Sequence, residues 1–451
     1  MRIDLMALER VSDKVVVARM RAVNQDGTDV DFGSNFSGQI QAPPGQGAAP
    51  DPAAVSGMSL FDPVNSQRYF PLADTAGRCL CTRYQTFLKL PARQSLDLVA
   101  AFPAPPPSVG KLGLLVPNAA PFLDVPVSSR PTATITVEDG QSLDPTSVTT
   151  APPQVVPVMA LAENAAGVEE DTGVDLRIRL SSDVLFALNK ADLSPQAQEA
   201  LREVAAKIDR AADSTVNIDG HTDDSGNSAI NKPLSERRAQ SVQAALQKLV
   251  TRASVNYQSR GHGSSQPVAS NTTPRGRELN RRVTVSFTRP RPEAASPTVS
   301  PSQSHKKTTL EAGKVAPVGY IGTWPRGSKV EVGSLRRVGQ EYVTLSWTVL
   351  NNDSVPLRAH EIFNGLGLEE GYYGPGVNGV MLEVGKVRHR VLRDQRGNGL
   401  GSYFLTMRPQ VTQLDQGESL VLTAMYKIPA DILSVTVNFP GYGRAPSVPV
   451  Q

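Results

Sequence analysis

The chain has 451 residues, of which 39% are hydrophobic, 20% are charged and only 5% are aromatic. This length predicts two to four domains, and a net charge of +3 is too small to indicate a nucleic-acid or anionic-membrane surface. The 36 prolines cluster between segments, which favours several linked domains over one compact enzyme, and no apolar run is long enough to predict a transmembrane helix.

The first element of the chain is a β-rich segment that recurs near the C-terminus. Residues 5–26 align without a gap to residues 332–353, and residues 90–105 align to residues 414–429. The aligned pairs include Leu8 with Leu335, Val16 with Val343 and Asn24 with Asn351, and residues 124–127 fall on residues 447–450. The repeat predicts two copies of one domain flanking a different domain.

Both copies, residues 1–128 and 315–451, have the pattern of β structure. Leu96, Leu98 and Ala100 alternate with other residues, and turn-forming residues recur along each copy. Each copy is therefore predicted to be an antiparallel β-sandwich. The pattern resembles the immunoglobulin-like modules of exported actinobacterial proteins, which implies an immunoglobulin-like fold for both flanking domains.

Two cysteines, Cys79 and Cys81, lie two residues apart in the first copy. Alternate side chains of a strand share a face, so two small buried residues and an oxidised pair both fit this spacing. They align with Gly399 and Gly401 of the second copy, so the fold does not require them.

Two segments, 129–172 and 289–314, are rich in Pro, Thr and Ser. Such segments bury too little apolar surface to offset the loss of chain entropy on folding. Both are predicted to be extended, mobile tethers.

The central segment, residues 173–288, has a mixed α and β pattern. Strands are predicted at 174–188, 216–220, 255–257 and 283–287, with two helices among them. The first helix, opened by Ser194 and Pro195, is predicted to bury Ala197, Leu201, Val204 and Ile208, and the second to bury Leu234, Val242, Ala245, Leu246 and Leu249. The order β-α-β-α-β-β predicts an α+β domain with its helices on one mixed sheet.

Arg238 interrupts the apolar stripe of the second predicted helix, because it lies four residues from both Leu234 and Val242. A charge at such a position must lie at the domain edge or be paired. Asp223 and Asp224, in the preceding loop, are candidate partners, and an exposed Arg near the helix start is the alternative. An Arg opposite an Asp could hold a zwitterion, the Asp taking an ammonium group and the Arg a carboxylate.

Two stretches of the central segment resemble the OmpA-like C-terminal domain. They are IDGHTDDSGNSAINKPLSERRAQSV, residues 218–242, and SRGHGSSQPVASNTTPRGRELNRRVTV, residues 259–285. They contain the family patterns GHTD-x-x-G, N-x-x-LS-x-x-RA, G-x-G and GR-x-x-NRRV at the family's spacing. One departure is Ala187, where the family often has Asp.

The resemblance implies that the central domain binds peptidoglycan through the free end of diaminopimelate. Asp223 matches the family's ammonium-binding Asp and Arg238 its carboxylate-binding Arg. The ligand-binding residues expected on this basis are Thr222, Asp223, Asp224, Ser225, Asn231 and Arg238.

Other residues of the same motifs are expected to have structural roles. Arg277, Asn280 and Arg281 are predicted to pin a loop to the sheet, and His221 is predicted to hydrogen-bond within the binding loop. His221, Asp223 and Asp224 could also be read as metal ligands, but hydrolytic metal sites take ligands from several segments. No cofactor, metal or catalytic residue is therefore expected.

The resemblance implies a non-enzymatic anchor in the cell envelope, outside the cytoplasm. Residues 1–11 lack the apolar run of a secretory signal, so the targeting segment is expected to lie outside this sequence. The alternative is a structural or adhesive envelope protein, whose β-sandwiches bind a protein or glycan partner while the central domain is only a tether.

Overall fold

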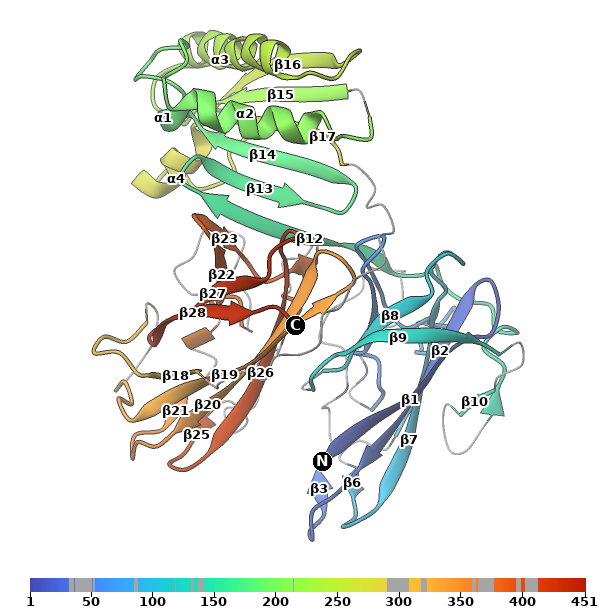
Figure 1. Ribbon diagram of the computed structural model, residues 1–451. Helices are drawn as coiled ribbons and strands as arrows, with labels where there is room; N and C mark the ends of the chain where they lie inside the picture. Colours follow the sequence, from blue (N-terminus) through green and yellow to red (C-terminus); the bar gives the residue numbers. More distant parts are fainter. Residues whose placement is uncertain are drawn as a thin grey trace.

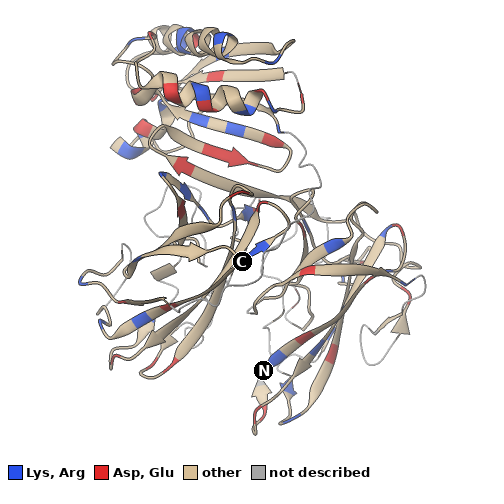
Figure 2. Ribbon diagram, viewed as in Figure 1, with Lys and Arg blue, Asp and Glu red and all other residues tan. Residues whose placement is uncertain are grey.

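The computed structural model describes residues 1–31, 36, 51, 53–84, 88–117, 119–130, 134–136, 142–213, 215–289, 308–317, 323–358, 362–363, 377–394, 399–401 and 413–451. Figure 1 shows an α/β domain stacked on two β domains that lie side by side. Figure 2 shows acidic and basic residues distributed over all three domains. No helix among the described residues is long and apolar enough to cross a membrane.

The first β domain is built from two groups of paired strands. One has the order β7-β2-β1, and the other has the order β9-β8-β4-β5, with the end of β9 also pairing in parallel with β1. The strands are β1 (Arg2–Arg10), β2 (Val15–Val23), β3 (Val30–Asp31), β4 (Ser59–Asp62), β5 (Gln67–Tyr69), β6 (Lys89–Leu90), β7 (Ser95–Pro103), β8 (Lys111–Leu115) and β9 (Phe122–Ser129), followed by the short pair β10 (Ile135–Thr136) and β11 (Ser142–Leu143).

The last β domain has the same strand order, as the sequence repeat predicted. The order β26-β20-β19 matches β7-β2-β1, and β28-β27-β22-β23 matches β9-β8-β4-β5. The strands are β18 (Thr308–Glu311), β19 (Ser328–Val338), β20 (Tyr342–Asn351), β21 (Leu357–Arg358), β22 (Met381–Val384), β23 (Val387–His389), β24 (Arg393–Asp394), β25 (Gln413–Leu414), β26 (Ser419–Lys427), β27 (Ser434–Phe439) and β28 (Gly443–Pro449).

One repeated residue shows why the sequence pattern persists. Asn24 and Asn351 are both fully buried at the end of equivalent strands. The Asn24 amide donates to the carbonyl groups of Leu90 and two other residues, and the Asn351 amide donates to Leu414 and one other. A buried amide group requires hydrogen-bond partners, so both copies have the Asn together with the loop to which it bonds.

The two cysteines form a disulfide, Cys79 to Cys81, inside the first β domain. Both are buried, and Cys81 forms a β-bridge with Ala100. Gly401 forms the equivalent bridge with Ala424 in the second copy. Of the two alternatives for the cysteines, the structure therefore has the oxidised pair. The equivalent bridge at Gly401 shows that the same backbone pairing forms without a disulfide.

The prediction of a mobile tether is wrong for the end of the segment before the central domain, which forms β12 (Val155–Asn164) and β13 (Gly167–Asp171). β12 pairs with β5 of the first copy, with β24 and β23 of the second copy and with β13 of the central sheet. Its alternation of buried residues, Met159, Leu161 and Glu163, is hidden by the Pro-rich composition around it. In the second predicted tether residues 308–311 form β18, and residues 290–307 lie outside the described part of the chain.

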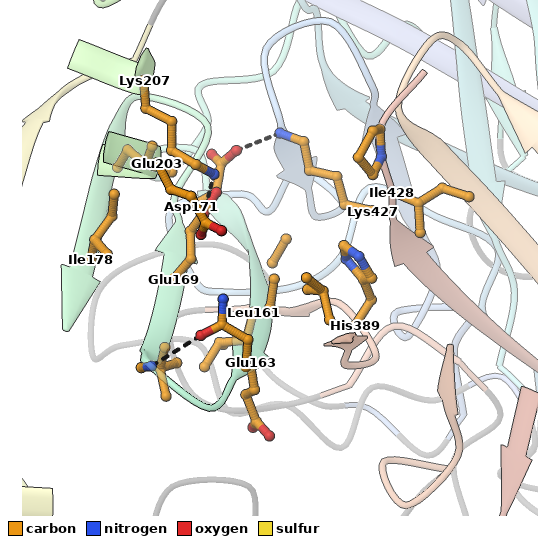
Figure 3. Close-up of a pocket in the computed structure, with 18 of the residues that line it drawn as sticks. Leu161, Glu163, Glu169, Asp171, Ile178, Glu203, Lys207, His389, Lys427 and Ile428 are labelled. Carbon is orange, nitrogen blue, oxygen red and sulfur yellow. Dashed lines mark hydrogen bonds and ion pairs between the residues drawn. The ribbon is translucent and has the colours of Figure 1, made fainter. Parts of the chain in front are cut away.

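Side chains also join the three domains. Glu163 of β12 accepts two hydrogen bonds, of 2.9 and 2.8 Å, from Arg390 of the second copy, and both residues are buried. Lys427 pairs with Asp171 at 2.6 Å across a cleft of about 560 Å³ between the second copy and the central domain (Figure 3). An apolar cluster adds Phe61, Val158, Val338, Tyr342, Leu392, Leu400 and Met425 from the two β domains and β12.

The central domain has one mixed sheet of order β13-β14-β17-β15-β16, in which β15 and β16 are parallel. Its further elements are β14 (Asp175–Ser181), α1 (Ser182–Leu185), α2 (Ala197–Ile208), β15 (Thr215–His221), α3 (Ser228–Leu249), β16 (Asn256–Gly263), α4 (Pro274–Asn280) and β17 (Arg282–Thr288). The predicted stripe of α2 shares one core with the sheet, as do Val242 and Leu246 of α3, whereas Ala245 and Leu249 are only partly buried against it. The strand predicted at 174–188 is wrong beyond Ser181, where the chain turns into α1.

Two glycines let α3 lie close to the central sheet. A Cβ atom on Gly220 would lie 2.2 Å from the Ser235 carbonyl oxygen, and one on Gly261 would lie 2.3 Å from the Glu236 nitrogen. The freed space allows direct bonds, because Glu236 accepts from the Gly261 nitrogen at 2.6 Å. The close approach fixes α3, and therefore Arg238, relative to the end of β15.

Gly220→Ala is expected to destabilise the central domain by about 1–3 kcal/mol, because α3 must move away from the sheet to admit the new methyl group. Faster amide hydrogen exchange in α3 of the full chain would report the loss. Gly27→Ala is the control, since nothing lies within 4 Å of a Cβ atom there. Equal exchange in both variants would contradict the packing argument.

Candidate functional site

The candidate site lies where β15 ends and α3 begins. The connecting loop, residues 222–227, turns through Gly226, which has a φ of +88°. Asn227 caps α3 by accepting a hydrogen bond from the Ile230 nitrogen at 3.1 Å. The loop therefore has a fixed shape, and it holds the predicted ammonium-binding residue beside the first turns of the helix.

Asp223 is held by hydrogen bonds on both carboxylate oxygens. Its Oδ1 accepts from the nitrogen of Ser225 at 3.0 Å and from the Ser225 hydroxyl, and its Oδ2 accepts from Arg281 at 2.7 Å. Burial alone would raise the pKa of Asp223, but these bonds outweigh it and hold the pKa below the usual value. The carboxylate is therefore charged at neutral pH.

Arg238 is the second charged group of the site and is 6% exposed. Its Nε donates to the Lys190 carbonyl oxygen at 3.0 Å, and its guanidinium lies 5.1 Å from the centre of the Phe186 ring. Burial lowers the pKa of Arg238, and the charge of Asp183 opposes the shift. No described residue accepts a hydrogen bond from the terminal nitrogens of Arg238, so these nitrogens can donate to an anionic group.

The structure adds a residue that the sequence reading had treated as structural. Arg281 donates to both oxygens of Asp183, at 3.0 and 2.6 Å, as well as to Asp223. Its guanidinium thus ties the loop at Asp223 to α1, which agrees with the predicted pinning role, and it also lies beside the candidate site. The GR-x-x-NRR motif had drawn attention to Arg281, whereas nothing in the sequence pointed to Asp183.

The remaining predicted residues divide into two groups. Ser225 and Asn231 shape the loop, because the Asn231 amide donates to the Ser225 carbonyl at 3.0 Å. Thr222 is buried and donates to the Asp223 carbonyl at 2.8 Å, so its hydroxyl is already used. Asp224 is exposed, and within the described residues no hydrogen bond or ion pair joins Arg238 to Asp224 or to Asp223, although the charge of Asp223 acts on Arg238. Direct contact of any of these residues with a ligand stays a prediction.

His221 does not hydrogen-bond within the loop as predicted. Its ring is buried and stacks on His262 at 5.0 Å, and its Nδ1 has no hydrogen-bond partner among the described residues. Burial lowers the pKa of His221 to about 3, aided by the charge of Arg282. His262 in turn bonds to Asp219 at 2.8 Å. Within the described ranges no three His, Cys, Asp or Glu side chains gather as a metal site.

The other two predicted residues of the GR-x-x-NRR motif hold a loop in place, as expected. Asn280 accepts from the nitrogens of Val268 and Ala269 and donates to the Ala269 carbonyl. Arg277 donates to the Asn271 carbonyl at 2.7 Å. This pinning sets the start of β17, and so it sets the position of Arg281.

Comparison with known proteins finds relatives of the central domain. Residues 185–281 match the model of the OmpA family. The outer-membrane lipoprotein YfiB of Pseudomonas aeruginosa is 37% identical over 141 residues, which are 30% of this chain and 81% of that protein. The peptidoglycan-binding protein ArfA of Mycobacterium tuberculosis is 41% identical over 104 residues, 23% of this chain and 31% of that protein.

A solved structure matches the same region. It is the cell wall anchor of the T6SS from Pseudomonas aeruginosa, 26% identical, with a TM-score of 0.26 over 28% of this chain and 88% of that one.

The buried state of His221 predicts a dependence of stability on pH. Because its folded pKa, about 3, lies below the ordinary 6.5, the folded state favours neutral imidazole. This stability is complete above about pH 6.5 and is lost as the pH falls toward 3. NMR titration should show His221 neutral at pH 5, and His221→Phe should flatten the loss of stability between pH 6.5 and 4.5. A ring that titrates near pH 6.5 would refute this.

Proposed function

Because the chain belongs to the OmpA family through its central domain, we propose that this domain binds peptidoglycan at the zwitterionic end of diaminopimelate and anchors the protein to the cell wall. The observation that carries the proposal is a charged carboxylate, Asp223, whose charge acts on a buried guanidinium, Arg238, and the terminal nitrogens of Arg238 are not used by described residues. Its relatives are proteins of the cell envelope, and this protein is placed there as well.

The two charges match the two ends of such a ligand. An ammonium group can bind Asp223 beside the loop, while a carboxylate can accept two hydrogen bonds from Arg238. Both protein groups are held before binding, Asp223 by Ser225 and Arg281, and Arg238 by Phe186 and Lys190. Little side-chain order then has to be created on binding, which favours affinity.

We propose binding without cleavage. The hydroxyl and imidazole nearest Asp223 are already engaged, because the Ser225 hydroxyl is directed to Asp223 and the His221 ring is buried against His262. The Ser225 hydroxyl is therefore not placed as a nucleophile, and His221 is not placed as its base.

The flanking domains are proposed to be immunoglobulin-like sandwiches, on the basis of their shared strand order and their short antiparallel strands. The second candidate function, presentation of a protein or glycan partner by these domains, gains support from β12. Because β12 joins both copies to the central domain, anything bound to a copy would be fixed to the wall through it.

Asp223→Ala and Arg238→Ala are each expected to weaken binding of a diaminopimelate-containing muropeptide by roughly ten- to a hundredfold. Each change removes a charge-assisted hydrogen bond and leaves a ligand charge without its partner. Arg238→Lys should also lose affinity, because an ammonium group cannot offer the planar pair of donors. Calorimetric titration of the full chain measures these effects.

The matched control is Arg237→Ala, which removes an exposed charge from the neighbouring position of α3. It should change affinity by less than about twofold, because exposed charges are screened. Unchanged affinity in a folded Arg238→Ala variant would place the site elsewhere.

Incubation with purified sacculi should separate binding from hydrolysis. The full chain is expected to co-sediment with sacculi, and the supernatant should contain no released muropeptides. Soluble muropeptides would contradict the absence of catalysis, and failure to sediment would contradict the binding function itself.

A further inference from the structure

Asp183, at the start of α1, lies beside the candidate site, and the role that we infer for it rests on the proposed function. The site holds two carboxylates and two guanidinium groups, Asp183, Asp223, Arg238 and Arg281. Arg281 lies between the carboxylates and bonds to both. The ligand ammonium and Arg281 therefore require the same carboxylate, Asp223.

Arg281 donates more hydrogen bonds to Asp183 than to Asp223. Its Nε and Nη2 donate to the two oxygens of Asp183, at 3.0 and 2.6 Å, which is a bidentate pair. Its Nη1 alone donates to Oδ2 of Asp223, at 2.7 Å. Asp183 thus takes two of the three donor nitrogens and leaves Asp223 with a single bond from the guanidinium.

The consequence for the ligand follows from the lone pairs of Asp223. Oδ1 already accepts from the nitrogen and the hydroxyl of Ser225. Oδ2 accepts one bond from Arg281, and a carboxylate oxygen can accept about two hydrogen bonds. One position on Oδ2 is therefore left for an ammonium group, provided that Arg281 does not turn its planar fork onto Asp223.

We propose that Asp183 is a positioning residue for ligand binding: by holding Arg281 in a bidentate pair, it keeps Asp223 available to the ammonium group of diaminopimelate. Without the Asp183 charge, Arg281 pairs with Asp223 through two nitrogens and occupies the ammonium position. Asp183 acts through Arg281 and does not touch the ligand. Its side chain is 49% exposed, so its loss leaves the core of the domain unchanged.

Asp183→Asn is expected to weaken binding of a diaminopimelate-containing tripeptide by about tenfold in the full chain, because a charge-assisted bond to the ligand is lost. In an Arg281→Gln background the same change should alter affinity by less than about twofold, because no guanidinium is left to redirect. Asp183→Glu should retain part of the wild-type affinity. Asp192→Asn, an exposed acid before α2, is the control and should bind like wild type.

A second probe tests the route of the effect. The same tripeptide with its free amino group acetylated should bind wild type and Asp183→Asn equally, because it has no ammonium group to be displaced. Equal losses from Asp183→Asn in the wild-type and Arg281→Gln backgrounds would overturn the proposal, as would unchanged affinity in Asp183→Asn. A wild-type chain that does not bind the unmodified tripeptide would instead refute the proposed function.

Discussion

The architecture depends on the backbone pairing of one strand, β12. Successive parts of this strand bond to β5 of the first copy, to β24 and β23 of the second and to β13 of the central sheet. Exposed strand edges tend to recruit a partner, and here one segment covers the equivalent edges of both repeats. The buried Glu163–Arg390 pair adds specificity to this joint, because either charge alone would be costly to bury.

Much of the central domain could be predicted from local pattern. The stripe from Ala197 to Ile208 and the alternation of Val283, Val285 and Phe287 each depend on one element facing one core, and the structure confirms them. The strand order of the flanking copies could be predicted to match because the repeat kept buried groups such as Asn24. The register of each strand pair depends on contacts between residues far apart in the sequence, which a local pattern does not predict.

The errors arose where a residue's role depends on distant partners. β12 lies in a Pro-rich segment, and its pairing edges are supplied by residues near 68 and 389, so composition indicated a tether. The motif around Arg281 predicts a role in holding a loop, but no local pattern predicts its bond to Asp183, which lies 98 residues earlier in the chain. Arg238 can be singled out from the sequence because its charge interrupts the apolar stripe of α3, and Asp223 because it lies in the preceding acidic loop and in the family pattern GHTD-x-x-G.

The joint between the domains also constrains the order of folding. Ser66 bonds to Tyr342 across 276 residues, and Glu163 bonds to Arg390 across 227. Contacts so far apart in sequence form slowly, because a long loop must first be closed. During synthesis the first copy and the central domain emerge with the β12 edge uncovered, and that edge stays open to wrong partners until the last copy arrives. Truncation after the central domain would therefore leave a species prone to aggregation, even though it keeps every residue of the candidate site.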